Sequence, residues 1–268
     1  MPITSLERPS PAFTRYIGID YSGAATADTG LKGLRIYQAE VKGRIAEVLP
    51  PPGSGKYWSR CGAAEWLLSC LHEPAPTLVG IDHGFSFPLP YFEQHRLPLD
   101  WHHFLEDFQQ HWPTDGRQVA VDDIRHGRVG HAHARGGNAR WRRLTERRCR
   151  AKSVFHFDVP GSVAKSTHAG LPWLLYLRRQ LGQRLHCWPF DGWQPPQGRS
   201  VVAEAYPALW KTGYPVEDRT PDQHDALAIA AWLREAEQAG TLEVYWLPRL
   251  SAEEAKLARI EGWILGVL

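Results

Sequence analysis

Two short apolar runs in the first third of the chain each end in an aspartate. The run Tyr16–Ile19 stops at Asp20, which a Ser22-Gly23 turn follows, and the run 77–81 stops at Asp82. Continuous apolar runs of this length, bounded by turn residues, predict strands that are buried on both faces of a sheet. A carboxylate at the end of such a strand is costly to desolvate unless a partner meets it. The pattern therefore predicts that other groups of the chain or a bound cation meet Asp20.

The segments around these runs predict the first half of an α/β domain. Strands are expected over about 15–21, 30–40 and 44–49, the last two as a hairpin, and a helix over 58–72 precedes the strand 77–81. A strand-helix-strand unit takes a right-handed crossover, which returns the second strand parallel to the first. We therefore expect the strands of Asp20 and Asp82 to be adjacent and parallel, with their ends about 4.8 Å apart.

Residues of about 85–198 interrupt this pattern and predict a large, mostly helical insertion. Helices are expected over 100–112, 140–150 and 168–182, and short strands over 154–157 and 184–188. The predicted arrangement is one domain over 1–268, whose core is formed by about 15–84 and 199–247.

The α/β pattern resumes after the insertion. A strand over 200–205 carries Glu204, and a short helix over 207–211 follows it. Thr220 and Pro221 are suited to begin a helix over 220–239. The C-terminal part predicts an edge strand over 242–247 and a helix over 251–259, which Ser251 and Glu254 cap.

Composition is typical of a globular protein of the cytoplasm. The chain is 43% hydrophobic over 268 residues, and no apolar run approaches the roughly 18 residues that span a bilayer. Residues 1–14 suggest a loose leader without the apolar segment of a signal peptide. The four cysteines lack metal-ligand spacing, which suits a reducing compartment. We therefore expect a soluble, cytoplasmic protein with no membrane partner.

A basic stretch contrasts with the net charge of only +2. Residues 125–152 hold nine Arg and one Lys against one acid, Glu146, whereas the rest of the chain has 21 basic and 28 acidic residues. A local positive patch on an acidic body favours a phosphate-bearing partner, because Arg can bind phosphate through two parallel hydrogen bonds. The alternative is a solvated, arginine-rich helix face. The expected contacts to DNA or RNA are Arg140, Arg142, Arg143, Arg147, Arg148 and Lys152.

Two further acids join Asp20, Asp82 and Glu204 as candidate site residues. Asp222 and Asp225 are spaced i, i+3 and lie on one face of the first turn of the 220–239 helix. Alone, such a pair also fits a helix N-terminus, whose dipole favours acids. Clustered acids raise one another's pKa unless a cation neutralises them, and hard oxygen ligands suit Mg²⁺ or Mn²⁺. Two such ions can activate a water and stabilise the leaving oxygen in phosphodiester cleavage.

Four segments, in this order, resemble the core motifs of the RuvC-like members of the ribonuclease H-like superfamily. They are Ile17-Gly-Ile-Asp-Tyr-Ser-Gly23, Val79-Gly-Ile-Asp-His-Gly-Phe85, Val202-Ala-Glu-Ala-Tyr-Pro-Ala-Leu-Trp210 and Asp222-Gln-His-Asp-Ala-Leu-Ala228. The chain is more similar still to a domain-of-unknown-function family of predicted nucleases with the RNase H fold. Residues 144–153, 161–163 and 261–264 share that similarity, so the resemblance covers nearly the whole chain.

The resemblance implies a three-layer α/β fold with a mixed five-stranded sheet in the order 3-2-1-4-5 and a metal-dependent nuclease activity. It implies that Asp20, Asp82, Asp222 and Asp225 bind Mg²⁺ or Mn²⁺, with Asp20 bridging two ions. The second acid of the related resolvases is usually Glu, so the shorter Asp82 would shift the metal. Glu204 would be an additional ligand or a group that supports the ligands. The expected catalytic set is Asp20, Asp82, Glu204 and Asp225, with Asp222 peripheral.

Two other classes of function fit parts of the sequence. ATP-using phosphotransferases of the actin and sugar-kinase type have a related sheet, and Asp20-Tyr-Ser-Gly23 loosely resembles their phosphate loop, but they usually need two such domains. A catalytically silent binding protein could keep the same fold. The sequence contains no G-x-x-x-x-G-K-[ST], G-x-G-x-x-G or G-x-S-x-G motif, which argues against P-loop, Rossmann and α/β-hydrolase proteins.

Overall fold

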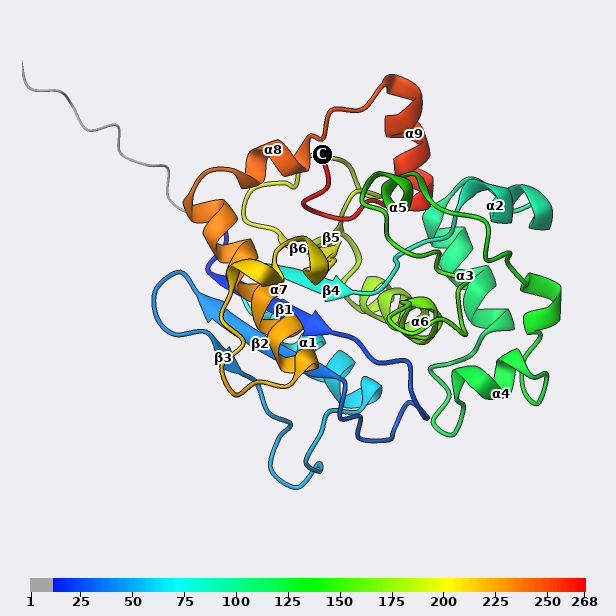
Figure 1. The fold of residues 1–268 in the computed structure, drawn as a ribbon, viewed down its shortest axis with the longest axis horizontal. Coiled ribbons are helices and arrows are strands. Elements are labelled where there is room, and N and C mark those ends of the chain that lie inside the picture. Colours follow the sequence, from blue (N-terminus) through cyan, green and yellow to red (C-terminus); the bar gives the residue numbers. More distant parts are fainter. Residues whose placement is uncertain (1–11) are drawn as a thin grey trace, which may run out of the picture.

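The computed structural model describes residues 12–268, which form an α/β fold around a mixed six-stranded sheet (Figure 1). The predicted leader over 1–14 lies mostly outside the described residues. The strands are β1 (Arg15–Asp20), β2 (Arg35–Glu40), β3 (Ala46–Glu47), β4 (Thr77–Asp82), β5 (Leu185–Cys187) and β6 (Ser200–Glu204). They lie in the order β3-β2-β1-β4-β6-β5.

The pairing of β1 with β4 confirms the central expectation of the sequence. The two strands are adjacent and parallel, and their register places Asp20 opposite Asp82. β2 runs antiparallel to β1, and β6 runs parallel to β4. The sheet has six strands and not the expected five. The additional strand is β5, which lies within the insertion at the position of the short strand expected over 184–188, and it pairs parallel with β6 at the edge of the sheet.

The helices cover both faces of this sheet (Figure 1). They are α1 (Arg60–His72), α2 (Leu89–His95), α3 (Trp101–His111), α4 (Val121–Arg125), α5 (Leu144–Arg148), α6 (Ala164–Leu181), α7 (Pro221–Gln238), α8 (Leu242–Trp246) and α9 (Ala252–Glu261). Short 3₁₀ helices are η1 (Ala132–Arg135), η2 (Gly182–Arg184), η3 (Pro207–Leu209) and η4 (Lys211–Gly213). The predicted caps are confirmed, since Thr220 caps α7 with Gln223 and Ser251 caps α9 with Glu254.

The sheet is the middle of three layers, with helices packed on each of its two faces. Ile17, Ile19 and Ile81 belong to the apolar cluster that includes residues of α1 and α6. Tyr16 and Leu78 belong to the cluster on the opposite face, which includes residues of α7. Because successive side chains of a strand point to opposite faces, the even-numbered positions of β1 and β4 face α7.

Three of the predicted elements differ in the structure. The helix expected over 140–150 is reduced to the five residues of α5. Residues 154–157 form turns, because Val154 and Phe155 are both buried against helices of the insertion rather than alternating between core and solvent. The edge strand expected over 242–247 is the helix α8. In a strand, Leu242, Val244 and Trp246 would lie on one face, whereas in a helix Leu242 and Trp246 share a face without Val244. Leu242 and Trp246 are buried and Val244 is exposed, which fits only the helix.

The insertion shares its apolar core with the sheet. Phe87, Phe104 and Leu174 lie in the same buried cluster as Ile19 and Ile81. Within residues 12–268, no helix combines the length and the apolar character that a membrane crossing requires.

The contact between α7 and β1 gives a test of this packing. A Cβ at Gly18 would lie 2.2 Å from the carbonyl oxygen of Ala226 and 2.6 Å from the backbone nitrogen of Ala230. Backbone atoms cannot move aside as a rotamer can, so we expect Gly18→Ala to cost about 3 kcal/mol of unfolding free energy. Gly213→Ala is the control, because no atom lies within 4 Å of its added Cβ. Urea melts of both variants measure the difference, and equal stabilities would contradict the close packing.

Candidate active site

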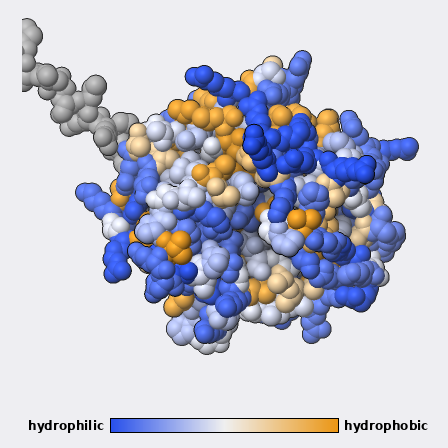
Figure 2. Space-filling model, in the orientation of Figure 1, coloured by the Kyte–Doolittle hydropathy of each residue, from blue (hydrophilic) through white to orange (hydrophobic). Residues whose placement is uncertain are grey.

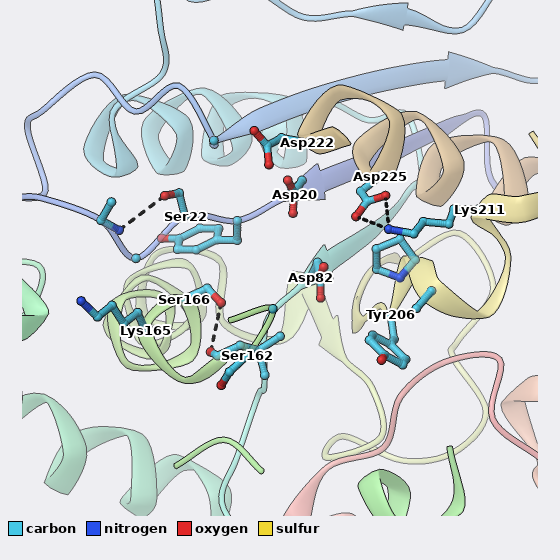
Figure 3. Close-up of a pocket in the computed structure, with 18 residues that line it drawn as sticks. Asp20, Ser22, Asp82, Ser162, Lys165, Ser166, Tyr206, Lys211, Asp222 and Asp225 are labelled. Carbon is cyan, nitrogen blue, oxygen red and sulfur yellow. Dashed lines mark hydrogen bonds and ion pairs between the residues drawn. The ribbon is translucent and has the colours of Figure 1, made fainter. Parts of the chain in front are cut away.

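A polar cavity of about 500 Å³ opens beyond the ends of β1 and β4. On the face shown in Figure 2 the surface is hollowed near its centre, and the side chains around the hollow are mostly hydrophilic. Figure 3 shows four aspartates gathered around the middle of the cavity, with Lys165 and Ser166 to one side and Tyr206 to the other. The four are Asp20, Asp82, Asp222 and Asp225.

Strand register and helix position bring these four carboxylates together. Asp20 and Asp82 are paired in the parallel ladder and occupy even-numbered positions, so both face α7. α7 begins over the same strand ends, and Asp222 and Asp225 lie in its first turns. The convergence of Asp20, Asp82, Asp222 and Asp225, expected from the sequence, is therefore present in the structure.

Burial and mutual repulsion raise the pKa of the two strand-end carboxyls. For Asp20, desolvation and then the charges of Asp82, Asp222 and Asp225 raise the pKa well above its ordinary value of 3.8. For Asp82, desolvation and then the charges of Asp225 and Glu204 raise the pKa from 3.8 to about 8. The cluster therefore keeps protons near neutral pH, and a bound cation would replace them.

The donor set of the cavity fits a hard divalent cation. Carboxylate oxygens are the ligands that Mg²⁺ and Mn²⁺ prefer. Among residues 12–268, no group donates a hydrogen bond to the carboxylate of Asp20, Asp82 or Asp222. With the side chains as they stand, the described residues contain no group of three or more His, Cys, Asp or Glu that could hold a metal ion. Metal binding would therefore require these aspartates to turn toward one another about χ1 and χ2.

Glu204 lies at the end of β6 but on the opposite face of the sheet from Asp82. In the ladder of β4 and β6, Glu204 stands opposite Ile81 rather than Asp82. This offset of one residue turns its side chain away from α7, and it does not line the cavity. The structure therefore does not support Glu204 as a metal ligand. Its charge still reaches the site, because it contributes to the raised pKa of Asp82.

Arg143 occupies the buried position that holds Glu204. Its Nη1 and Nη2 donate to Glu204 at 2.6 and 2.5 Å, its Nε donates to Glu146 at 2.9 Å, and only 1% of its side chain is exposed. The backbone N–H of Phe85 donates to the same Glu204 carboxylate at 3.1 Å. Removal of one partner from such a buried pair leaves a charge without compensation, at about 3–5 kcal/mol. Arg143 therefore stabilises the end of β6. The expectation that it contacts phosphate is wrong, because its guanidinium is buried against Glu204 and Glu146.

The other basic residues of the expected set divide into structural and exposed groups. Arg142 donates to the carbonyl of Ala151, and Arg148 pairs with Glu254 at 2.8 Å. Arg140, Arg147 and Lys152 are exposed and have no carboxylate partner among the described residues. Lys152 lies 3.5 Å from a Cβ added at Gly161, which lines the cavity, so it stands at the rim of the site.

Several residues of the cavity were not singled out in the sequence. Lys211 comes from η4 and donates to both oxygens of Asp225, each at 3.0 Å. Lys165 and Ser166 come from the first turn of α6, and Tyr206 follows β6. The sequence signal for Lys211 is its place in the short connection between the strand that ends at Glu204 and the helix whose first turn carries Asp222.

Comparison of the chain with protein-family models, with curated proteins and with solved structures found no match in any of the three.

The raised pKa of Asp82 predicts a pH dependence of stability without metal. The folded protein holds this proton to about pH 8, whereas the ordinary pKa is 3.8, so unfolding releases a proton in between. The free energy of unfolding therefore falls as pH rises, by about 1–2 kcal/mol between pH 7 and pH 8.5. Buried His83 and His168, whose pKa values are lowered to about 4 and about 3, act with the opposite sign and cannot mimic this slope.

Urea melts in EDTA across this pH window measure the effect. Asp82→Asn should reduce the slope, because the amide does not titrate. The remainder comes from Asp20 and from the buried thiols, whose pKa values are also raised. The exposed Asp218→Asn is the control. An equal slope in wild type and Asp82→Asn would show that Asp82 does not titrate within this pH window.

Proposed function

We propose that this protein is a divalent-metal-dependent nuclease that hydrolyses phosphodiester bonds in DNA or RNA. The observation that carries the proposal is the convergence of four aspartates at one polar cavity, where Asp20 and Asp82 have no hydrogen-bond donor among the described residues. Repulsion within such a cluster is unfavourable for the protein alone and favourable once a divalent cation binds. Mg²⁺ or Mn²⁺ is the cofactor this donor set suits.

A ribonuclease H-like identity of the fold is part of the proposal. It is supported by the antiparallel β2 beside β1, by the parallel β1, β4 and β6, and by α7 over the strand ends. Without the edge strand β5, the order β3-β2-β1-β4-β6 corresponds to the 3-2-1-4-5 order that the sequence resemblance implies.

In this proposal the aspartates and the buried pair of Arg143 and Glu204 have different tasks. Asp20, Asp82, Asp222 and Asp225 would hold the metal, with Asp20 in the middle because the other three charges all act on it. When bound, two divalent ions would supply the activated water and stabilise the leaving oxygen. Arg143 keeps Glu204 at the end of β6 and, through Glu204, fixes the backbone of Phe85 just after Asp82. The end of β4, which carries Asp82, is thereby held in place.

Exchange of Asp20 for Asn should have two opposite effects. It removes one of four repelling charges, so in EDTA the melting temperature should be equal to that of the wild type or higher. It also removes the central ligand, so the rise in melting temperature on adding millimolar Mn²⁺ should shrink, and hydrolysis of oligonucleotides should be lost.

Melting scans of both proteins in EDTA and in Mn²⁺ make the test. Strong destabilisation of Asp20→Asn in EDTA, together with no effect of Mn²⁺ on either protein, would show that Asp20 is structural. A rise in melting temperature with ATP that requires Asp20 would instead favour a phosphotransferase.

The exposed basic residues should contribute sequence-independent binding energy. Removal of two phosphate contacts in Arg140→Ala/Lys152→Ala should reduce the slope of log K against log salt by about 1.5. Lys42→Ala/Arg44→Ala is the matched control, since these exposed cations lie in the hairpin between β2 and β3, at the end of the sheet remote from Asp20. Binding isotherms over a series of salt concentrations measure both slopes. Equal slopes in the two double variants would remove Arg140 and Lys152 from the interface.

A further inference from the structure

One ammonium group lies inside the carboxylate cluster. Nζ of Lys211 is 3.0 Å from Oδ1 and 3.0 Å from Oδ2 of Asp225 (Figure 3). The side chains of Lys211 and Asp225 keep 38% and 18% of their exposure, so the pair stands at the wall of the cavity rather than in the core.

The charge of Lys211 extends beyond its direct partner. It opposes the rise in pKa of both Asp20 and Asp82, so three of the four aspartates are stabilised by the same ammonium. Lys165 also lines the cavity, but its Nζ is 2.5 Å from Asp122, outside the cluster. The two lysines therefore share a cavity and differ in whether they neutralise the four aspartates.

The contact has a direct consequence for metal binding. Lys211 donates to both oxygens of Asp225, and an ammonium group and a divalent cation cannot occupy the same side of one carboxylate. An ion that binds Asp225 on that side, across its two oxygens, must therefore displace Lys211.

We propose that Lys211 is a positioning residue that serves as the built-in counter-cation of the cluster and competes with the divalent ion for Asp225. The inference rests on the proposed metal-dependent function and adds a determinant of metal affinity to it. In the metal-free protein, Lys211 orients the Asp225 carboxylate and reduces repulsion among the aspartates. In the metal-bound protein, that interaction is given up, so the lysine weakens apparent metal affinity while keeping the empty cluster folded.

Lys211→Met separates these two effects, and the test uses the full chain. In EDTA the variant should melt about 2–4 °C below wild type, because the ion pair between Lys211 and Asp225 is lost. In a Mg²⁺ titration followed by melting temperature, its midpoint should lie about fivefold below that of wild type. Lys211→Arg keeps the charge and should restore both values toward wild type. Lys165→Met should leave the Mg²⁺ midpoint unchanged.

Each outcome decides the matter. An unchanged or higher Mg²⁺ midpoint in Lys211→Met overturns the proposal, and so does an equal decrease in Lys165→Met, which would indicate a general effect of charge. If wild type ignores Mg²⁺ altogether, the metal-dependent function fails and competition fails with it. The comparison in EDTA then still decides the counter-cation role, because an undiminished melting temperature of Lys211→Met excludes it and a lower one supports it.

Discussion

The parallel register of β1 and β4 is the constraint on which the candidate site depends. It sets Asp20 directly opposite Asp82 and turns both toward α7, whose first turns carry Asp222 and Asp225. Gly18 and Gly80 lie below them on the same face and allow α7 to approach the strands closely. Acids that are far apart in the sequence therefore meet because two strands end at the same level beneath one helix.

Concentration of negative charge at this place has to be offset by other parts of the chain. On one face of the sheet, Lys211 faces Asp225. On the other face, buried Arg143 compensates Glu204 and Glu146. The first cation is partly exposed and held by one carboxylate, so an incoming ion can displace it. The second is buried and bound to two carboxylates. Its departure would leave Glu204 and Glu146 buried without a counter-charge.

This division of labour changes the interpretation of the basic stretch. Its arginines looked alike in the sequence, but Arg143 holds the end of β6 and Arg148 pairs with Glu254 of α9. Arg142 donates to the carbonyl of Ala151 within the segment, and Lys152 donates to the carbonyl of Pro160. Arg140 and Lys152 are exposed and pair with no carboxylate of the described residues. An arginine-rich segment next to an acidic site can thus serve first as the scaffold of that site.

The sequence by itself determined what depends on neighbouring residues. Apolar runs ending in Asp20 and Asp82, the capping residues Thr220 and Ser251, and the i, i+3 spacing of Asp222 and Asp225 are local patterns, and the structure has each of them in place. Right-handed crossover then sufficed to predict that the first two acids meet.

The tertiary structure decided what depends on distant pairing and burial. An offset of one residue between β4 and β6 decided that Glu204 does not join the cluster, because it turns the side chain to the other face of the sheet. The residue pattern within β6 does not reveal this offset. Whether Arg143 binds phosphate or a carboxylate was set by a partner 61 residues away. Whether residues 242–246 form a strand or a helix was set by which of their side chains found an apolar surface to cover. Such choices are made by contacts across the fold, because the free energy of a buried charge or side chain depends on what surrounds it.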